Sequence, residues 1–404
     1  MQERNKTYPL SAVAESIEIP DSAYERAEKR YNDLGEWMGR EESTVHDYDP
    51  EVFPQGSFLL GTVTRPSDED DEYDLDLGVK LRKGVSKETH AQKELKSMVG
   101  KELRSYRKAR GIEEDLDEKR RCWRLIYQDE LSFHLDIVPC IPEDESRQST
   151  IKEAMMAADT EERLADEVSE LTVSITDTDQ RGYASICSDW NVSNPQGYGH
   201  WFTSRVRQAK QAVLTMERRA EVLPLPTHKL KAPLQQCVQI LKLHRDQMFE
   251  DDHDRAPISI IITTLAARAY EGQEQIDKAL LHIVDTMEEH VSDSNPRVPN
   301  PVNPEEDFAD KWYTDEGREL GLEDNFWRWL EQAKADFLQM AETRDAHDLE
   351  KYANSHLGVH LDPTKLREEY GLSTAASATS STKSSRSERS KTHIQTPPKP
   401  WTTT

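Results

Sequence analysis

Cysteine is scarce in this sequence, and long apolar segments do not occur in it. The 404 residues hold four cysteines, which are widely separated and show neither CxxC nor Cys/His spacing: Cys122, Cys140, Cys187 and Cys237. This spacing argues against a disulfide framework or a zinc site, so free buried thiols are expected. No apolar run approaches the length of a membrane span, and the first residues lack the apolar core of a signal peptide. We therefore expect a cytoplasmic protein that is not associated with a membrane.

Basic residues are also fewer than acidic ones. The chain has 52 Lys and Arg against 77 Asp and Glu, a formal net charge of -25. An acidic surface repels nucleic acid at long range, and phosphate contacts dominate affinity for a duplex. No basic stripe occurs outside the C-terminal tail, so activation by duplex DNA is not expected. Small nucleotides that carry their own Mg²⁺ remain compatible, because the metal screens the repulsion locally.

Hydrophobic periodicity indicates both helices and strands in the first half of the chain. Apolar residues at spacings of three and four predict a helix from Asp21 to about Arg40, capped by Asp21 or Ser22. Apolar and polar residues alternate in DEYDLDLGVKL, which predicts a half-buried strand over 74–81. Other expected features are a turn-rich stretch over 54–61, a helix over 87–110, and strands over 121–128 and 131–138.

Beyond Pro142 the sequence is mostly helical in character. A loop rich in Gly, Asn and Pro is expected before His200, and VPNPVNPEEDF interrupts the helical pattern with prolines. Helices are predicted over 151–171, around 206–216, 234–241 and 258–270, and over 325–343. The segment from Ser373 to Thr404 has almost no apolar residues, so it cannot offset its own ordering entropy and should be disordered.

Three aspartates carry the strongest chemical signal. Asp74 and Asp76 lie two residues apart on one expected strand, and Asp136 lies on a later one. Phosphoryl transfer from a nucleoside triphosphate uses two Mg²⁺ ions about 4 Å apart, which take oxygen ligands. Neighbouring aspartates on one strand suit ligands that bridge both ions. A third aspartate can complete the site and help to remove the proton of the attacking hydroxyl. The pattern predicts a nucleotidyltransferase with two Mg²⁺ ions, Mn²⁺ being an alternative.

The turn before these aspartates supports this interpretation. Gly56 lets the backbone approach a triphosphate closely, and Ser57 offers a hydroxyl. Taken alone, Asp-x-Asp occurs on many solvated strands; the ordered set of turn, Asp-x-Asp and later strand aspartate is more specific. His134 shares the face of the third aspartate and either contacts substrate or only satisfies a hydrogen bond. Trp123 and Trp190 are expected in the core.

At these residues the sequence resembles the cGAS/DncV-like nucleotidyltransferases, or CD-NTases, the SMODS-type cyclic oligonucleotide synthases of bacterial CBASS anti-phage systems. The resemblance is carried by FPQGSFLLGTVTRP, YDLDLGVKL, LQQCVQILKLHRDQMF, PISIIITTLAARAY and NPVNPEEDFADKW. It implies an α+β fold with two lobes and the active site in the cleft between them. The implied divisions are a Pol β-like core with a mixed sheet and an N-terminal spine helix (1–195), an oligoadenylate-synthase-like helical lobe (196–372) and a disordered tail (373–404).

The resemblance also implies an activity and roles for particular residues. Members join ATP, GTP or other triphosphates into cyclic di- or trinucleotides, releasing pyrophosphate. By motif, Gly56 and Ser57 would grip the donor triphosphate, and the three aspartates would bind Mg²⁺. Lys242 resembles the triphosphate-binding lysine of the family, and Ser259 its γ-phosphate-binding serine. Considered without the family, Lys242 is an exposed helix lysine and Ser259 a helix cap.

Partners and rival functions stay open at this point. NTPs, ATP and also GTP, are the expected substrates. In many such systems HORMA-type or ubiquitin-transfer-like proteins act on a flexible C-terminus, and TPPKPWTTT offers either a docking point or an inert end. The first rival is a nucleotidyltransferase that modifies a macromolecule or a small acceptor. The second is a binding module that kept the fold without the activity.

Overall fold

A mixed β-sheet forms the centre of one half of the molecule. The computed structural model describes residues 9–65, 72–128, 132–211 and 231–373. The strands follow the order β1-β2-β5-β4-β3, and β6 and β7 continue from β5. Their bounds are β1 (Pro50–Pro54), β2 (Tyr73–Leu81), β3 (Asp117–Glu118), β4 (Trp123–Tyr127), β5 (Phe133–Pro142), β6 (Val173–Ile175) and β7 (Asn191–Ser193). This arrangement confirms the predicted α+β class.

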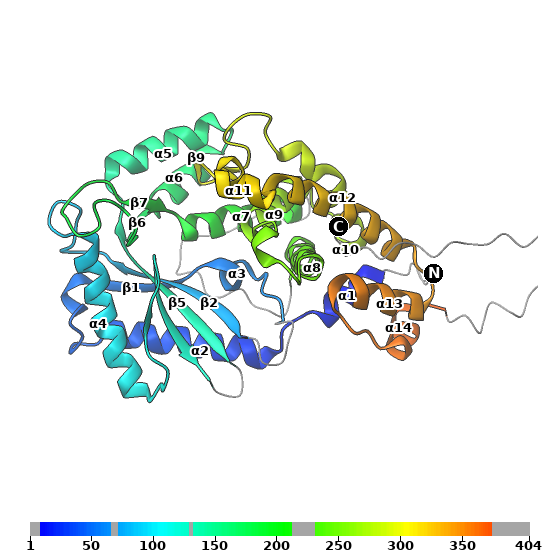
Figure 1. The fold of residues 1–404 in the computed structure, drawn as a ribbon, viewed down its shortest axis with the longest axis horizontal. Coiled ribbons are helices and arrows are strands. Elements are labelled where there is room, and N and C mark those ends of the chain that lie inside the picture. Colours follow the sequence, from blue (N-terminus) through cyan, green and yellow to red (C-terminus); the bar gives the residue numbers. More distant parts are fainter. Residues whose placement is uncertain (1–8, 66–71, 129–131, 212–230, 374–404) are drawn as a thin grey trace, which may run out of the picture.

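Helices surround the sheet and make up most of the remaining chain (Figure 1). Those in contact with the sheet are α2 (Asp21–Gly39), α3 (Gly56–Leu60) and α4 (Gln92–Arg110). The others are α1 (Pro9–Ser16), α5 (Glu145–Ala157), α6 (Glu162–Ser169), α7 (Pro195–Gln211), α8 (Pro233–Met248), α9 (Ser259–Ala269), α10 (Ile276–Thr286), α11 (Asp315–Leu320), α12 (Leu322–Glu342), α13 (Ala346–Leu357) and α14 (Pro363–Tyr370). A small hairpin, β8 (Pro299–Asn300) and β9 (Asn303–Asp307), interrupts them.

Strands β2 and β5 run parallel, and their register sets the geometry of the site. Asp76 pairs with Asp136, and Asp74 pairs with His134. The alternate residues Leu75 and Leu77 are fully buried against α2 and α4. Because side chains alternate across a strand, the aspartates lie on the other face of the sheet. The predicted half-buried character holds for the first part of β2, whereas Gly78 and Lys80, on the same face as the aspartates, are buried.

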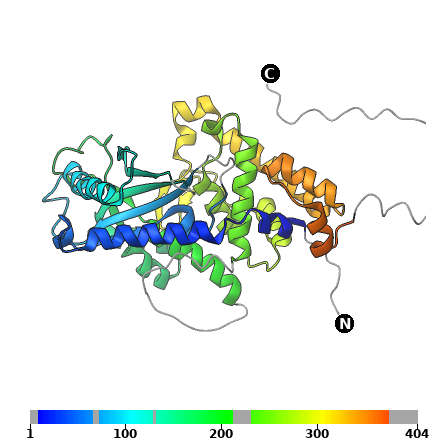
Figure 2. The ribbon, with the colours of Figure 1, turned by 90° about the horizontal axis from the view of Figure 1, so that it is seen from below.

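The apolar core has two large parts among the described residues. One joins the sheet to α2 and α4, and the other joins the helices α8, α9, α10 and α12. Side chains of α1, such as Leu10 and Val13, belong to the helical core, while α2 begins beside that core and runs lengthwise along the sheet (Figure 2). The chain thus crosses from one core to the other between α1 and α2. The division of the chain at residue 195 stays a prediction.

Several predicted elements differ from the structure at their ends. Helix α2 has Pro20 at its N-cap position rather than Asp21 or Ser22. The stretch predicted as a turn over 54–61 contains the short helix α3, and α4 begins at Gln92 instead of 87. The helix predicted over 151–171 is two helices, because Asp159 adopts a left-handed conformation with φ 60° that ends α5. These differences arise from local backbone geometry that periodicity does not encode.

The structure also contains short strands that the sequence pattern did not predict. The loop expected before His200 holds β6 and β7 and the start of α7, and the proline-rich segment holds the β8–β9 hairpin. Strands of two or three residues show no periodicity of their own and depend on the strand beside them. The residues expected to continue α7, Val213 and Met216, and the tail from 374 onward lie outside the described residues. Within the described chain, no helix has both the length and the apolar character needed to cross a membrane.

A cluster of ion pairs and hydrogen bonds around the buried carboxylate of Asp177 ties the turn between β3 and β4 to β7. The carboxylate of Asp177 accepts hydrogen bonds from Arg120 at 2.7 Å, Arg121 at 3.0 Å and Asn191 at 2.8 Å. Burial alone would raise the pKa of Asp177, but the hydrogen bonds from Arg120 and Arg121 outweigh it and lower the pKa to about 2. A lowered pKa means that the folded protein favours the ionised carboxylate.

This cluster predicts a particular acid sensitivity. The stabilisation by Asp177, about 2 kcal/mol from the pKa difference, is complete above the ordinary carboxylate pKa and is lost as pH falls from about 4 to about 2. We expect Asp177→Asn to lower the unfolding temperature at pH 7 and to approach the wild type only near pH 2. Thermal unfolding across this range measures the effect. Asp251→Asn, at an exposed position, is the matched control and should follow the wild type throughout.

Candidate active site

Three carboxylates gather where β2 and β5 lie side by side. Asp76 and Asp136 are directly paired across the parallel strands, and Asp74 is one alternation away on β2. The Asp74 side chain is 69% exposed, whereas Asp76 is only partly exposed. Burial, followed by the negative charges of Asp136 and Asp74, raises the pKa of Asp76 to about 6. The structure therefore brings the three predicted metal ligands into one electrostatically linked group.

Arg124 on β4 holds the third carboxylate in place. Arg124 and Asp136 are register partners in the antiparallel pairing of β4 with β5. Nε and Nη2 of Arg124 donate to the two carboxylate oxygens of Asp136, each at 2.7 Å. This bidentate pairing raises the pKa of Arg124 above its ordinary value. A carboxylate has about four lone-pair positions, so Asp136 can keep Arg124 and still bind a metal ion.

The segment of residues 55–63, called here the Gly-Ser segment, lies directly against Asp76. The backbone N–H of Gln55 donates to the carbonyl of Asp76 at 2.9 Å, and the Gln55 side chain donates to the carbonyl of Leu77 at 2.9 Å. Gly56 has φ 61°, and a Cβ at this position would lie 2.1 Å from Oδ2 of Asp76. Only glycine fits both the backbone conformation and this close approach. Gly56 begins the short helix α3, and Ser57, its second residue, therefore lies immediately beside the carboxylates.

Lys242 reaches the same region from helix α8. Its Nζ donates to the backbone carbonyl of Thr62 at 3.0 Å. Burial, followed by the positive charge of Arg245, lowers the pKa of Lys242 to about 8, while the negative charge of Asp76 acts in the opposite direction. The interpretation of Lys242 as an exposed helix lysine is therefore wrong. It is a partly buried cation that faces the Gly-Ser segment.

Ser259 is the first residue of α9 and not its cap. The N-cap residue is Ile258, whose apolar side chain cannot cap the helix. The hydroxyl oxygen of Ser259 instead accepts a hydrogen bond from Nη1 of Arg245 at 3.0 Å. Since Arg245 and Lys242 are three residues apart on α8, Ser259 and Lys242 lie on the same side of that helix. The structure thus brings together the two residues that the sequence placed far apart.

His134 is engaged at the edge of the carboxylate group. Its Nε2 contacts the carboxylate of Glu72, and its Nδ1 lies 3.4 Å from Oδ1 of Asp74. This position favours the simpler of the two expectations, a histidine that satisfies neighbouring acceptors. Trp123 and Trp190 are buried, as expected for core residues.

A metal ion suits the carboxylate group on electrostatic grounds. Among residues 9–65, 72–128, 132–211 and 231–373, no three His, Cys, Asp or Glu side chains form a ready-made metal cluster. Burial is the main reason that the pKa of Asp76 is raised, and the negative charges of Asp136 and Asp74 raise it further. A divalent cation among Asp74, Asp76 and Asp136 would remove the repulsion among them, and carboxylate oxygens are the ligands that Mg²⁺ prefers. The residues present therefore fit the expected ion.

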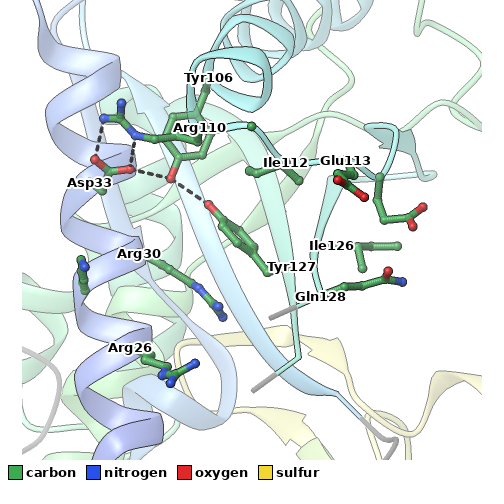
Figure 3. Close-up of a pocket in the computed structure, with 13 residues that line it drawn as sticks. Arg26, Arg30, Asp33, Tyr106, Arg110, Ile112, Glu113, Ile126, Tyr127 and Gln128 are labelled. Atoms are coloured by element: carbon green, nitrogen blue, oxygen red, sulfur yellow. Dashed lines mark hydrogen bonds and ion pairs between the residues drawn. The ribbon is translucent and has the colours of Figure 1, made fainter. Parts of the chain in front are cut away.

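A cavity of about 780 Å³ lies elsewhere, between α2, the end of α4 and β4 (Figure 3). The Arg30 guanidinium lies 4.3 Å from the ring centroids of Tyr127 and Phe133. Phe133 and Asp136 are an odd number of residues apart on β5, so they occupy opposite faces of the sheet. The sheet separates this cavity from the carboxylates, and the cavity is not part of the candidate active site.

Sequence reasoning missed several residues that contact the site. Arg124 gave no signal beyond its place on a predicted strand, and Gln235, Gln239 and Arg245 resembled ordinary helix residues. Their spacing along α8, together with Lys242, was the one available sign that they share a face. The sequence does not show which carbonyl groups these side chains bind, so the polar face of α8 looks the same as a face exposed to solvent.

Comparisons with known proteins agree with the geometry. The family described as "Cyclic GMP-AMP synthase DncV-like, nucleotidyltransferase domain" matches residues 50–139. A c-di-GMP synthase of Roseivirga ehrenbergii is 30% identical over 307 residues, covering 75% of this chain and 72% of that protein. The cyclic dinucleotide synthase CdnG of Bradyrhizobium diazoefficiens is 23% identical over 322 residues, covering 75% and 69%.

Solved structures show the same fold. The CD-NTase CdnG of Bradyrhizobium diazoefficiens in complex with GTP has a TM-score of 0.60 at 21% identity, covering 87% of this chain and 95% of that one. The Vibrio cholerae cyclic AMP-GMP synthase DncV in complex with a linear intermediate has a TM-score of 0.51 at 14% identity, covering 89% and 85%. The extent of the match to the Roseivirga enzyme, together with this fold, settles the family. The chain belongs to the DncV-like nucleotidyltransferases, the CD-NTases, and is an enzyme of that class.

Proposed function

We propose that this enzyme joins two nucleoside triphosphates into a cyclic dinucleotide and releases two molecules of pyrophosphate. The observation that carries the proposal is the direct pairing of Asp76 with Asp136, with Asp74 beside them and Gly56 packed on Asp76. GTP is the proposed substrate in at least one position, because the 30% identical relative is a c-di-GMP synthase and CdnG is solved with GTP. ATP is the alternative in the other position.

Enzymes of this family use divalent metal ions, and we propose Mg²⁺ held by Asp74, Asp76 and Asp136. When bound, the ions neutralise the phosphate charge and favour an oxygen nucleophile. The chain itself orients the reactants: Asp136 is fixed by Arg124, and Asp76 is fixed against the Gly-Ser segment. Asp76 lies between Asp74, which is exposed to solvent, and Asp136, which is held by Arg124. We propose two ions because Asp76 would then share one ion with each neighbour.

We propose for this enzyme the reaction that the family resemblance implies. The 3′- or 2′-hydroxyl oxygen of the acceptor nucleotide forms a bond to the α-phosphorus of the donor, and the bond from that phosphorus to pyrophosphate breaks. Asp136 is placed to take the hydroxyl proton. The linear product then offers its own hydroxyl to its remaining triphosphate, and a second transfer closes the ring. Both steps need the same carboxylates.

The donor triphosphate is proposed to lie between the Gly-Ser segment and helix α8. Ser57 is half-exposed beside the carboxylates, and Lys242 contacts the same segment through the carbonyl of Thr62. Ser259 is held by Arg245, one turn further along α8 than Lys242. The lysine supplies one positive charge and ammonium N–H donors to the phosphate oxygens, and the two serines supply one hydroxyl donor each. We propose that Gly56 serves by allowing the backbone to approach.

A cellular role follows from the family. We propose that the product is a second messenger of anti-phage defence and that the enzyme acts in the cytoplasm. A HORMA-type or ubiquitin-transfer-like protein acting on the C-terminal tail is a further proposal, supported by the family resemblance and by the TPPKPWTTT sequence alone.

Product analysis tests the proposed reaction. Purified protein with Mg²⁺ and all four NTPs should release pyrophosphate and give a phosphatase-resistant cyclic dinucleotide, identified by mass spectrometry. A cyclic trinucleotide would change the ring size, and label transferred to protein or RNA would favour the rival that modifies an acceptor. Nucleotide binding with no pyrophosphate release would favour the non-catalytic rival.

Replacing the central carboxylate tests the metal assignment. We expect Asp76→Asn to lower turnover by at least about 100-fold, because a metal ligand matters more than the outer contacts whose loss costs up to that much. Mg²⁺ should raise the unfolding temperature of the wild type and not that of this variant. Pyrophosphate release and thermal unfolding measure the two effects, with Asp251→Asn as the control. Normal turnover in Asp76→Asn would rule out the assignment.

Gly56 offers a second test that leaves every carboxylate in place. In Gly56→Ala, the new Cβ would collide with Asp76 Oδ2, and the left-handed φ would be strained, so the turn or the carboxylate must shift. A displacement near 1 Å costs about 100-fold in rate, and we expect a loss of that order in kcat/KM. Gly39→Ala is the matched control, since nothing lies within 4 Å of the added Cβ. Equal activity of the two variants would contradict the proposed role of the close contact.

A further inference from the structure

Helix α8 presents a row of polar side chains to the Gly-Ser segment. Gln235, Gln239 and Lys242 are spaced so that they share one face of the helix. Gln235 Nε2 donates to the carbonyl of Leu60 at 2.8 Å, Gln239 Nε2 to that of Val63 at 2.5 Å, and Lys242 Nζ to that of Thr62 at 3.0 Å. One helix of the helical core thus holds three carbonyls of the segment that carries Ser57.

Of these three hydrogen bonds, the one from Gln239 is the hardest for water to replace. Its side chain is fully buried, so water cannot substitute for its bond to Val63. Gln235 is half-buried, and its Oε1 also accepts from the N–H of Ala232 at 2.9 Å, which ties it to the start of α8. The two glutamines carry no charge and would not compete for a phosphate as Lys242 would. When Lys242 turns to a triphosphate, the glutamines are what keeps the segment on α8.

Arg245, one turn further along α8, forms a hydrogen bond with Ser259. Its Nη1 donates to the carbonyl of Pro257 and to Oγ of Ser259, each at 3.0 Å, and its Nη2 pairs with Asp246 at 2.5 Å. A guanidinium has no acceptor atom, so the Ser259 oxygen must accept in this bond. The hydroxyl hydrogen of Ser259 is then left for another acceptor. Arg245 therefore fixes both the position of Ser259 and its role as a donor.

We propose that Gln239 and Arg245 are positioning residues for the donor triphosphate. Gln239 fixes the segment that carries Ser57, and Arg245 turns the hydroxyl of Ser259, so that the two serines face the phosphates from either side of Lys242. The inference rests on the proposed function, in which Ser57, Lys242 and Ser259 bind the triphosphate. It adds that helix α8 sets the distance between the two serines, which lie on different lobes.

The test compares nucleotide affinity in variants that each remove one positioning contact. Gln239→Leu and Arg245→Met are measured by calorimetry with Mg²⁺ and an α,β-methylene analogue of GTP, or of ATP where ATP is the triphosphate consumed. Gln239→Leu loses the bond to Val63, and Arg245→Met loses the bonds to Pro257 and Ser259 and the ion pair with Asp246, so each variant leaves one serine without its support. We expect Kd to rise about tenfold, which corresponds to about 1.4 kcal/mol. The control is Gln236→Leu, half-buried on the same helix but turned about 100° from Gln235, and its Kd should stay at the wild-type value.

Crossed double variants separate positioning from a general loss of structure. Gln239 is expected to act through Ser57, so Gln239→Leu with Ser57→Ala should weaken binding by less than the product of the single effects. Gln239→Leu with Ser259→Ala should give the full product. Arg245→Met should show the reverse pattern, coupled to Ser259 and independent of Ser57. A variant that merely loosened the fold would couple equally to both serines.

The outcomes distinguish this inference from the function on which it rests. If Ser57→Ala and Ser259→Ala both bind the analogue as the wild type does, the proposed triphosphate site itself fails. If those serines matter but Gln239→Leu and Arg245→Met leave Kd unchanged, or show the full product with both serines, the positioning roles are wrong. Should Gln239→Leu unfold well below the control, Gln235→Leu replaces it, since the half-buried Gln235 holds the same segment.

Discussion

The register of the parallel pair β2 and β5 is the constraint on which the rest of the site depends. It places Asp76 opposite Asp136, and a slip of one residue would turn either carboxylate into the apolar face. The buried leucines of β2, packed against α2 and α4, make that slip costly because they would have to move to the face that carries the aspartates. The hydrophobic core on one side of the sheet therefore fixes the chemistry on the other.

The fold gathers three negatively charged side chains, Asp74, Asp76 and Asp136, in one place. Two cations partly offset the repulsion among the three aspartates. Arg124 binds Asp136 through Nε and Nη2 of its guanidinium, and the ammonium of Lys242 acts from a greater distance. These cations do not saturate the carboxylates, and a divalent ion can still enter. The same arrangement explains how an acidic protein handles a polyanionic substrate: attraction is local, and the remaining surface charge does not need to favour binding.

Helix α8 connects this centre to the helical core. Its apolar face is buried among α9, α10 and α12, and its polar face holds the Gly-Ser segment and the start of α9. A rigid element anchored in a core positions side chains more accurately than a loop does, which favours the proposed positioning roles of Gln239 and Arg245. Arg124 supports Asp136 in the same way, through a bidentate contact from a strand of the sheet.

By itself, the sequence determined the α+β class and the strand faces of β2 and β5, because alternation is a local property of the chain. Motif spacing, which is also local, led to the proposal of Gly56, Ser57, Asp74, Asp76 and Asp136 as site residues. The family resemblance extended this to Lys242 and Ser259. Only the tertiary structure decided that Asp76 lies opposite Asp136, that Arg124 holds Asp136, and that α8 binds the Gly-Ser segment. Those contacts join residues up to 180 positions apart, and no periodicity within one segment specifies its partner in another.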